Sequence, residues 1–430
     1  MLGTGFERVL MTVSKRPEIL LLTHRFPYPP DKGDRIRMFH ILEWLSRRVR
    51  IHLGCLADEP FKPEDLKRLE TLCERIEVVS LGKHSSRFRI GVSLARGQTA
   101  TVGAFRSSAL AEIVKRWARQ TQYKAALASS SALAPYLRIP ELKNIPTVFD
   151  LIDVDSQKWL DYAQSTHGPR RWLYLTEAKR LRELERELSG WSKALVLVSE
   201  AETNLYRNFT GAQHVYTVTN GVDLDAFQIQ GTPSRKESGC VFVGALDYFP
   251  NVDAACWFCR DVWPEIHRCH PEASMALVGR RPIAAVRRLA KVPGVIVVGQ
   301  VADVRPFLAA AAVVVVPLRL ARGVQNKVLE ALAMGKATVA SPQSLVGLQA
   351  NGTPPVLTAS DPSEWVDAVL HLLGDEAGRR RLGIEGRRFV KSHHRWEQCL
   401  EPLGTILDLP ECIPGRIGHI VPAGMTPTSH

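Results

Sequence analysis

The chain has 430 residues, which predicts two domains, because a single hydrophobic core stops growing at roughly 250 to 300 residues. Hydrophobic residues make up 45% and charged residues 23%, a composition that is typical of folded globular proteins and excludes disorder, collagen-like repeats and coiled coils. The formal net charge of +12 predicts attraction to anions, but the sequence has no zinc-finger spacing, basic region with heptads or RNA-recognition motif, so nucleic acid is not an expected partner.

The sequence pattern also leads us to expect neither a membrane-spanning nor a secreted protein. The longest apolar run, from Phe307 to Leu318, has 12 residues, whereas a spanning helix needs roughly 20. Residues 1–26 have no apolar segment of signal-peptide length followed by a small-residue cleavage site, and the eight cysteines lack the spacing of a disulfide framework. We therefore expect a cytoplasmic protein.

The alternation of short apolar strands with amphipathic helices predicts a parallel α/β protein. Strands are expected at residues 19–23, 51–55, 76–80, 125–129, 147–150, 194–199, 240–244, 274–279, 295–299, 313–317 and 337–340. Helices are expected at 35–46, 63–74, 107–119 and 170–190. The pattern restarts after the polar loop at 220–239, which indicates two doubly wound, Rossmann-like domains in tandem with a ligand cleft between them.

The expected boundaries follow from this restart. They are an N-terminal extension (1–18), an N-terminal domain (19–218), a C-terminal domain (219–395), a C-terminal helix (396–410) and a tail (411–430). The tail has no apolar periodicity, whereas the segment from Trp396 to Leu407 has the pattern of a helix that packs back across the domains.

The first candidate functional loop is HRFPYPPDKGDRIR, which follows the first strand. Prolines stiffen this loop, and Gly33 lets the backbone approach a phosphate or sugar at the start of the next helix. Arg35 and Arg37 are either anion contacts or solvated helix residues, and the sequence leaves both readings open.

A second group is acidic. In FDLIDVDSQKW the residues Asp150, Asp153 and Asp155 come directly after a predicted strand, where catalytic groups gather in this fold. Clustered carboxylates repel each other and need hydroxyl, metal or cationic partners. The alternative is that Asp155 or Ser156 caps a helix.

Glycines stand at the ends of several predicted strands, where they either form a simple turn or let a ligand approach the backbone. They are Gly33, Gly244, Gly279, Gly299 and Gly323. As a set on loops that share one edge of each sheet, they favour anion binding at helix N-termini.

The most informative stretch is RGVQNKVLEALAMGK, in which we expect a helix from Gly323 to Met334. Asn326, Lys327 and Glu330 then share one face in its first two turns. A cation near the positive end of a helix is unfavourable unless an anion is present, so Lys327 predicts a diphosphate, and Glu330 can accept hydrogen bonds from ribose hydroxyls. The alternative is a solvated helix face with an internal contact between Glu330 and Lys327.

A CxxC pair, Cys256 and Cys259, with His267 and Cys269 downstream, raises the question of zinc. Both thiols share a helical stripe with Trp263, so we expect a packed face and no metal site.

The residues quoted so far resemble a known family. The string VVGQVADVRPFLAAAAVVVVPLRLARGVQNKVLEALAMGKATVAS (297–341) and the motif NGVD (220–223) are similar to family 4-type glycosyltransferases of the GT-B fold, and the likeness spans Ile19 to about Leu403. The loop HRFPYPPDKGDRIR with DVDSQKW and FVGALDYFPNVDA resembles the subgroup of sugar transferases associated with bacterial exopolysaccharide and PEP-CTERM sorting loci.

The resemblance implies a retaining, metal-independent transferase of the hexosyltransferase class that takes a nucleotide-diphosphate sugar as donor and needs no cofactor. It also implies a lipid-linked or polysaccharide acceptor in exopolysaccharide biosynthesis. Together with the basic charge, such an acceptor leads us to expect peripheral attachment to an anionic membrane surface, the inner face of the cytoplasmic membrane. The C-terminal domain would hold the donor and the N-terminal domain the acceptor.

Position by position, Glu330 corresponds to the second glutamate of the family's E-x7-E motif, which binds ribose, and Lys327 stands beside the diphosphate. The donor-binding residues expected are Gly33, Gly244, Gly299, Val301, Gly323, Asn326, Lys327 and Glu330. The catalytic residues expected are Asp153, Asp155 and Arg322, and no metal ligand is expected.

Three departures from the family pattern are visible. The first glutamate of E-x7-E is replaced by Arg322, so the usual carboxylate contact to the donor sugar is missing or rebuilt. The Arg and Lys pair that many relatives carry after the first strand of the second domain is absent from GALDYFPN, which makes Lys327 and Arg322 the better candidates for phosphate neutralisation. Ile152 occupies the position of a common histidine, so Asp153 or Asp155 would orient the acceptor. The alternatives are a non-hydrolysing nucleotide-sugar epimerase, or a catalytically silent nucleotide-sugar-binding partner of another transferase.

Overall fold

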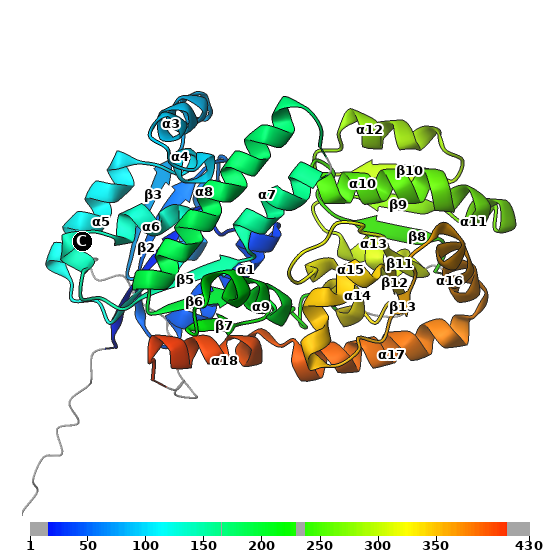
Figure 1. Ribbon diagram of the computed structural model, residues 1–430. Coiled ribbons are helices and arrows are strands. Elements are labelled where there is room, and N and C mark those ends of the chain that lie inside the picture. Colours follow the sequence, from blue (N-terminus) through cyan, green and yellow to red (C-terminus); the bar gives the residue numbers. More distant parts are fainter. Residues whose placement is uncertain (1–15, 165, 229–236, 411–430) are drawn as a thin grey trace, which may run out of the picture.

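The computed structural model describes residues 16–164, 166–228 and 237–410. The expected tail and most of the expected N-terminal extension lie outside these residues. Within them the chain forms two α/β domains that stand side by side (Figure 1).

The first domain has a seven-stranded parallel sheet in the order β3-β2-β1-β4-β5-β6-β7. Its strands are β1 (Glu18–Thr23), β2 (Arg50–Ala57), β3 (Arg75–Ser80), β4 (Ala125–Ser129), β5 (Thr147–Ile152), β6 (Ala194–Leu197) and β7 (Val215–Thr217). Its helices are α1 (Gly33–Ser46), α2 (Pro63–Glu70), α3 (Lys83–Ala95), α4 (Ala100–Ala104), α5 (Ser108–Gln120), α6 (Ala134–Leu137), α7 (Asp155–Gln164), α8 (Pro169–Trp191) and α9 (Glu200–Thr210).

The second domain has a six-stranded parallel sheet in the order β10-β9-β8-β11-β12-β13. Its strands are β8 (Cys240–Val243), β9 (Met275–Val278), β10 (Val295–Gly299), β11 (Val313–Val316), β12 (Thr338–Ala340) and β13 (Leu357–Thr358). Its helices are α10 (Phe249–Trp257), α11 (Trp263–Cys269), α12 (Ala284–Arg287), α13 (Arg305–Ala310), α14 (Asn326–Ala333), α15 (Pro342–Leu345), α16 (Pro362–Gly374) and α17 (Glu376–His393). The predicted fold of two Rossmann-like parallel-sheet domains is confirmed.

Strand β1 shows why the first sheet is buried on both faces. Ile19 and Leu21 point into the core on one face, and Leu20 and Leu22 point into the core on the other, because successive side chains of a strand alternate. The second domain has a single large core, which contains Cys259 of the CxxC pair.

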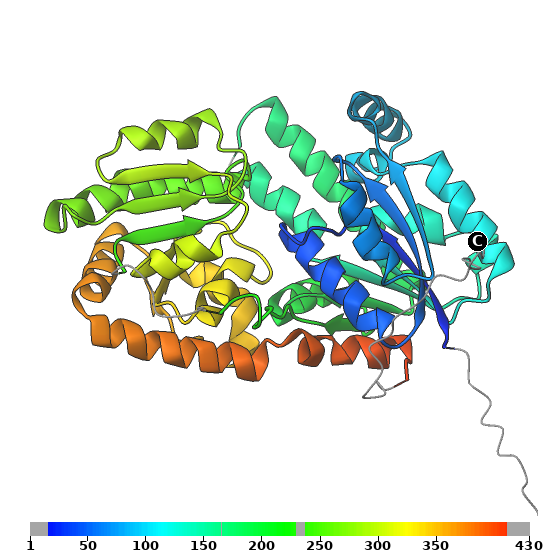
Figure 2. The ribbon, with the colours of Figure 1, turned by 180° about the vertical axis from the view of Figure 1, so that it is seen from behind.

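The last helix, α18 (Trp396–Leu407), belongs to the core of the first domain. Trp396, Leu400 and Leu403 are buried in the same cluster as Ile19 and other residues of the β1 face. Figures 1 and 2 show α17 and α18 running along one edge of the molecule, from the second domain back beneath the first. The chain therefore crosses between the domains twice, at the loop before β8 and between α17 and α18.

Candidate active site

The loops that follow the strands of both sheets line one cavity of about 740 Å³ between the domains. The first domain contributes the loops after β1, β2, β4, β5 and β6, and the second contributes those after β8, β9 and β11. This is the edge at which ligands bind in parallel α/β sheets. Eight of the eleven residues predicted for the site line the cavity: Gly33, Asp153, Asp155, Gly244, Arg322, Asn326, Lys327 and Glu330.

Helix α14 begins at Asn326, later than the predicted Gly323, and its first turn faces the cavity. Gln325 stands at the N-cap without a side-chain hydrogen bond, and the first turn holds no acidic residue. Its free N–H groups therefore leave positive potential at this end of the helix.

Lys327 and Glu330 lie one turn apart on α14 and both contact the cavity. Burial lowers the pKa of Lys327 to about 7, although the charge of Glu330 opposes this shift. Burial likewise raises the pKa of Glu330 to about 7, against the charge of Lys327. The Glu330 carboxylate accepts no hydrogen bond from any residue that the structure describes, so its oxygens remain available to hydroxyl donors.

The Lys327 ammonium is held in a defined place. It donates to Asn251 Oδ1 at 2.6 Å and lies 4.6 Å from the centre of the Phe242 ring. The Asn251 amide in turn donates to the carbonyl of Ala245 at 3.0 Å, which fixes its orientation. A Cβ at Gly244 would stand 3.0 Å from Lys327 Nζ, so glycine at the end of β8 makes room for the amine.

A buried polar chain connects the two domains beneath the cavity. Arg37, which is fully buried, donates to Asp150 at 2.7 Å and to Asn220 Oδ1 at 2.8 Å. Asn220 then donates to Asn326 Oδ1 at 3.0 Å, and its carbonyl lies 2.9 Å from His394 Nδ1. Arg37 is thus neither a contact for a ligand anion nor a solvated residue. Its guanidinium is hydrogen-bonded to Asp150 and Asn220, and Asn220 in turn donates to Asn326 at the start of α14.

Asp153 follows β5 and touches the second domain. Its Oδ1 atom is buried without a hydrogen-bond partner among the described residues, and a Cβ on Gly323 would stand 2.1 Å from that atom. Burial, together with the charge of Glu202, raises the pKa of Asp153 to about 7. Asp155 is the first residue of α7, and its Oδ2 lies 3.5 Å from Ser131 Oγ.

Arg322 forms an ion-pair bridge between the domains. Its guanidinium donates to Asp161 at 3.0 Å and to Glu202 at 2.7 Å. Glu202 is 4% exposed, and its other oxygen accepts from the Val154 N–H at 2.8 Å. Two carboxylates of the first domain therefore already neutralise the cation that was predicted to neutralise phosphate.

Three predicted residues do not line the cavity. Gly323 is buried in the β11–α14 loop with φ of 60°, where it packs against Asp153. Gly299 ends β10 with φ of 79°, and a Cβ added there would lie 3.8 Å from Pro282. Val301 packs against the core of the second domain.

Sequence reasoning missed Glu202 and the charged residues that follow β2 and β9. Ser199 and Glu202 have the S-x-x-E spacing of a capping box, and Ser199 does accept from the Glu202 N–H at 3.3 Å. That pattern predicts a helix start but not the contacts of the Glu202 side chain. Rather than complete the capping box, this side chain accepts from Arg322 and from the Val154 N–H. Glu59, Arg280 and Arg281 also line the cavity, and no motif pointed to them.

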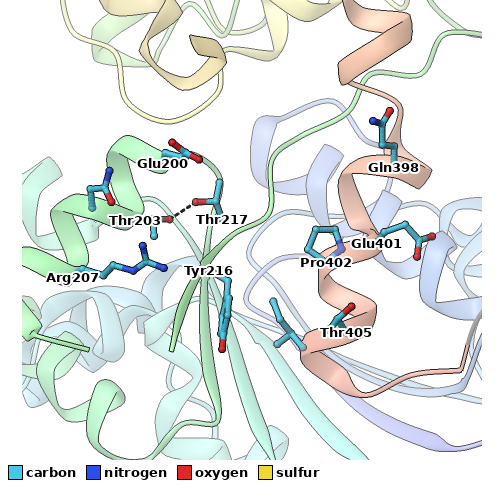
Figure 3. A pocket seen from close by; sticks show the side chains of 11 residues that line it. Glu200, Thr203, Arg207, Tyr216, Thr217, Gln398, Glu401, Pro402 and Thr405 are labelled. Carbon is cyan, nitrogen blue, oxygen red and sulfur yellow. Dashed lines mark hydrogen bonds between the residues drawn. The ribbon is translucent and has the colours of Figure 1, made fainter. Parts of the chain in front are cut away.

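A second hollow of about 790 Å³ lies outside this cleft, where α9 and β7 face α18 (Figure 3). Thr203 and Thr217 share a hydrogen bond of 2.8 Å there, and Arg207, Tyr216 and Glu401 surround them. None of the residues predicted for the site lies in this hollow.

Comparison with known proteins agrees with this geometry. Residues 237–375 match the family model of the glycosyl transferases group 1. A search of curated protein sequences finds no match.

Solved structures resemble the whole chain. HepE from Anabaena, solved with UDP, is 15% identical with a TM-score of 0.64, over 91% of this chain and 99% of that chain. The same protein solved with UDP-glucose is 14% identical with a TM-score of 0.66, over 91% of this chain and 99% of that chain. Sucrose-phosphate synthase from Thermosynechococcus elongatus is 17% identical with a TM-score of 0.65, over 91% of this chain and 98% of that chain.

These structures share the two-domain GT-B plan with the present fold, and the matched family model covers most of the second domain, including Lys327 and Glu330. The chain accordingly has the GT-B fold, and residues 237–375 of its second domain match the glycosyl transferases group 1.

Proposed function

We propose that the chain transfers a hexose from a nucleotide-diphosphate sugar to a lipid-linked or polysaccharide acceptor in exopolysaccharide synthesis. The observation that carries the donor assignment is the Glu330 carboxylate, which faces the cavity without a hydrogen-bond partner among the described residues. It stands one turn from Lys327 on a helix whose N-terminus is uncapped. Hydroxyls of a ribose and oxygens of a diphosphate match these two groups in chemistry and spacing. The UDP and UDP-glucose complexes of HepE support this choice of donor.

In the proposed reaction, the bond between the anomeric carbon and the diphosphate oxygen breaks, and a bond to the acceptor hydroxyl oxygen forms. The hydroxyl proton leaves with the departing nucleoside diphosphate. Negative charge grows on the diphosphate as the bond breaks, and Lys327 with the N–H groups of α14 stabilises it without a metal. Retention at the anomeric carbon is proposed from the family resemblance.

The test is transfer of labelled sugar from a panel of nucleotide sugars to lipid extracted from cells. Purified protein should transfer label, and Glu330→Ala and Lys327→Ala should lose most of this activity while the protein remains folded. Unchanged nucleotide affinity in Glu330→Ala would refute the ribose assignment. Conversion of the nucleotide sugar to its epimer without acceptor would establish the epimerase alternative instead.

One observation favours a second candidate, a catalytically silent nucleotide-sugar-binding partner. Arg322 stands where relatives carry the first glutamate of their motif, and Asp161 and Glu202 engage its guanidinium. Donor binding without transfer to any extracted acceptor would support this candidate. Transfer that depends on Glu330 excludes it.

We further propose peripheral attachment to anionic membrane through one side of the molecule. Among the described helices, none is both long and apolar enough to cross a bilayer. Trp172 in the first turn of α8 is 70% exposed and follows the exposed Arg170 and Arg171. Phe88 on α3 and Ile283 beside α12 are also exposed, and α3, the start of α8 and α12 all lie at the top of Figures 1 and 2. Exposed aromatic groups among arginines suit an acidic lipid surface.

Co-sedimentation with vesicles tests this attachment. The protein should bind vesicles that contain phosphatidylglycerol and not vesicles of phosphatidylcholine alone, and Trp172→Ala should bind less than the wild type. Equal binding of Trp172→Ala, or no dependence on lipid charge, would refute the assignment of this surface.

A further inference from the structure

The carboxylate of Glu59, two residues after β2, is surrounded by four cations from both domains. From the first domain, Lys32 Nζ lies 2.9 Å and Arg35 Nη2 lies 2.7 Å from Glu59 Oε2. From the second domain, Arg281 Nη2 lies 2.9 Å from Oε1, and Arg280 Nη1 lies 3.9 Å from Oε2. Glu59 is therefore the common anion of a positively charged wall of the cavity.

The positive charges outnumber the carboxylates near them. Besides Glu59, Arg35 pairs with Asp31 at 3.0 Å and Arg281 approaches Asp247 at 3.8 Å. Lys32 and Arg280 pair with no carboxylate other than Glu59 among the described residues. Four cations thus share three carboxylates on the wall of the cavity.

Arg280 is the least satisfied member of this group. Its side chain is 19% exposed, its guanidinium donates no hydrogen bond to a described residue, and its Nε atom is buried without a partner. Shielding a guanidinium group from water without hydrogen bonds is unfavourable, and an anion with several acceptor oxygens would supply the missing bonds. A single carboxylate shared by four cations does not supply enough of them.

The pKa shifts of Glu59 and Lys32 reflect the same concentration of positive charge. Burial, the hydrogen bond from Lys32 and the surrounding cations act together on Glu59, and although burial opposes ionisation its pKa falls to about 2. Burial and the charges of Arg35 and Arg280 lower the pKa of Lys32, against the effect of Glu59. The site therefore holds an anion firmly even in the free protein.

This wall is separate from the predicted diphosphate contact at Lys327. Glu59 and Arg280 follow β2 and β9, which neighbour β1 and β8 on one side of each sheet. The bridge of Arg322 and Glu202 joins the loop after β11 to the first turn of α9, which follows β6, on the other side of β1 and β8. Lys327 donates to Asn251 of α10 and is not among the described cations that pair with Glu59.

We propose that Lys32, Arg35, Arg280 and Arg281 form a second phosphoryl-binding site in the cleft and that Glu59 occupies the place of the phosphoryl group when the site is empty. A phosphoryl group offers three oxygens to three guanidinium groups and an ammonium, which suits this set better than one carboxylate. Glu59 lies in a loop after its strand and is 17% exposed, so it can turn away when the ligand enters.

The compound that brings the phosphoryl group rests on the proposed function. It is a phosphorylated acceptor, because the donor diphosphate is assigned to Lys327 and the start of α14. Since each domain supplies two of the four cations, the acceptor phosphoryl group would lie between the domains. The site itself is tested by binding alone, independently of sugar transfer.

Isothermal titration calorimetry with inorganic phosphate, pyrophosphate and UDP tests the proposal on the full chain. Arg280→Gln should weaken phosphate and pyrophosphate binding by about tenfold or more, since it removes charged hydrogen bonds to the ligand. Glu59→Gln should tighten the same binding by about tenfold, because the competing carboxylate is gone. Arg388→Gln on the outer helix α17 is the matched control and should bind like the wild type.

Wild-type affinities in both Arg280→Gln and Glu59→Gln would overturn the proposal, as would the absence of phosphate binding in the wild type and in Glu59→Gln. Phosphate that still binds at saturating UDP supports an acceptor phosphate as the ligand, whereas displacement of phosphate by UDP would overturn the proposal of a second site. Loss of UDP binding in Glu330→Gln with phosphate binding intact separates this site from the proposed ribose contact.

Discussion

The ion-pair bridge of Arg322 provides a direct test of how the two domains are held together. We expect Arg322→Gln to lower the free energy of unfolding by about 3 kcal/mol. The guanidinium makes one hydrogen bond of 2.7 Å to Glu202 and one of 3.0 Å to Asp161. Hydrogen bonds to charged partners contribute about 1.5 to 3 kcal/mol each. The Glu202 side chain is 6% exposed and loses its cation in a buried place, whereas that of Asp161 is 27% exposed and can regain water.

The assay is urea denaturation followed by tryptophan fluorescence, with the shift in the transition midpoint converted to free energy through the measured slope. Arg319→Gln is the matched control, because Arg319 lies in the same loop and pairs with Asp253 while its side chain is 51% exposed. Exposed pairs contribute less than about 1 kcal/mol, so the control should shift the midpoint little. Equal shifts in the two variants would refute the argument from burial.

Three further predictions concern the cavity and the buried chain beneath it. Gly244→Ala should weaken UDP-sugar affinity about tenfold in calorimetry. The added methyl group would stand 3.0 Å from Lys327 Nζ and therefore displace the amine. Unchanged affinity would mean that Lys327 does not contact the donor. Asp153 binds a proton more tightly in the folded than in the unfolded chain, since its pKa is raised from 3.8 to about 7, so wild-type stability should fall as pH rises through this window. Asp153→Asn should remove about 2 to 3 kcal/mol of that fall between pH 5 and 8 in urea titrations, and a parallel fall in the variant would contradict the assignment. Arg37→Met should lower the free energy of unfolding by about 3 to 5 kcal/mol, because it leaves Asp150 buried without its cation, and a loss under 1 kcal/mol would show that Asp150 finds another partner.

The sequence predicts the sheets well because most strands are continuous apolar runs. All eleven expected strands are present, and β1 and β11 are the clearest cases, since each is buried on both faces. The missed strands are β7 (Val215–Thr217) and β13 (Leu357–Thr358), which are too short to show any periodicity and lie at sheet edges. Their pairing depends on the neighbouring strand rather than on their own residues.

The candidate site likewise has residues that the sequence predicts and residues that it does not. Lys327 and Glu330 were predictable, because both lie on one helix and their spacing alone puts them on one face. The partners of Arg322 and Arg280 were not, because Glu202 and Glu59 lie in the other domain and meet them only once the domains are placed. Spacing along the chain carries no information about contacts of that kind.

Helix α18 has a consequence for how the protein is made. The first domain consists of two separate pieces of chain, because Trp396, Leu400 and Leu403 complete a core that otherwise comes from residues before 219. During synthesis the ribosome must produce the whole second domain before those side chains exist, so the first domain waits with an exposed apolar groove over α1 and β1. The core of the first domain is thus completed only after the chain of the second domain has been synthesised.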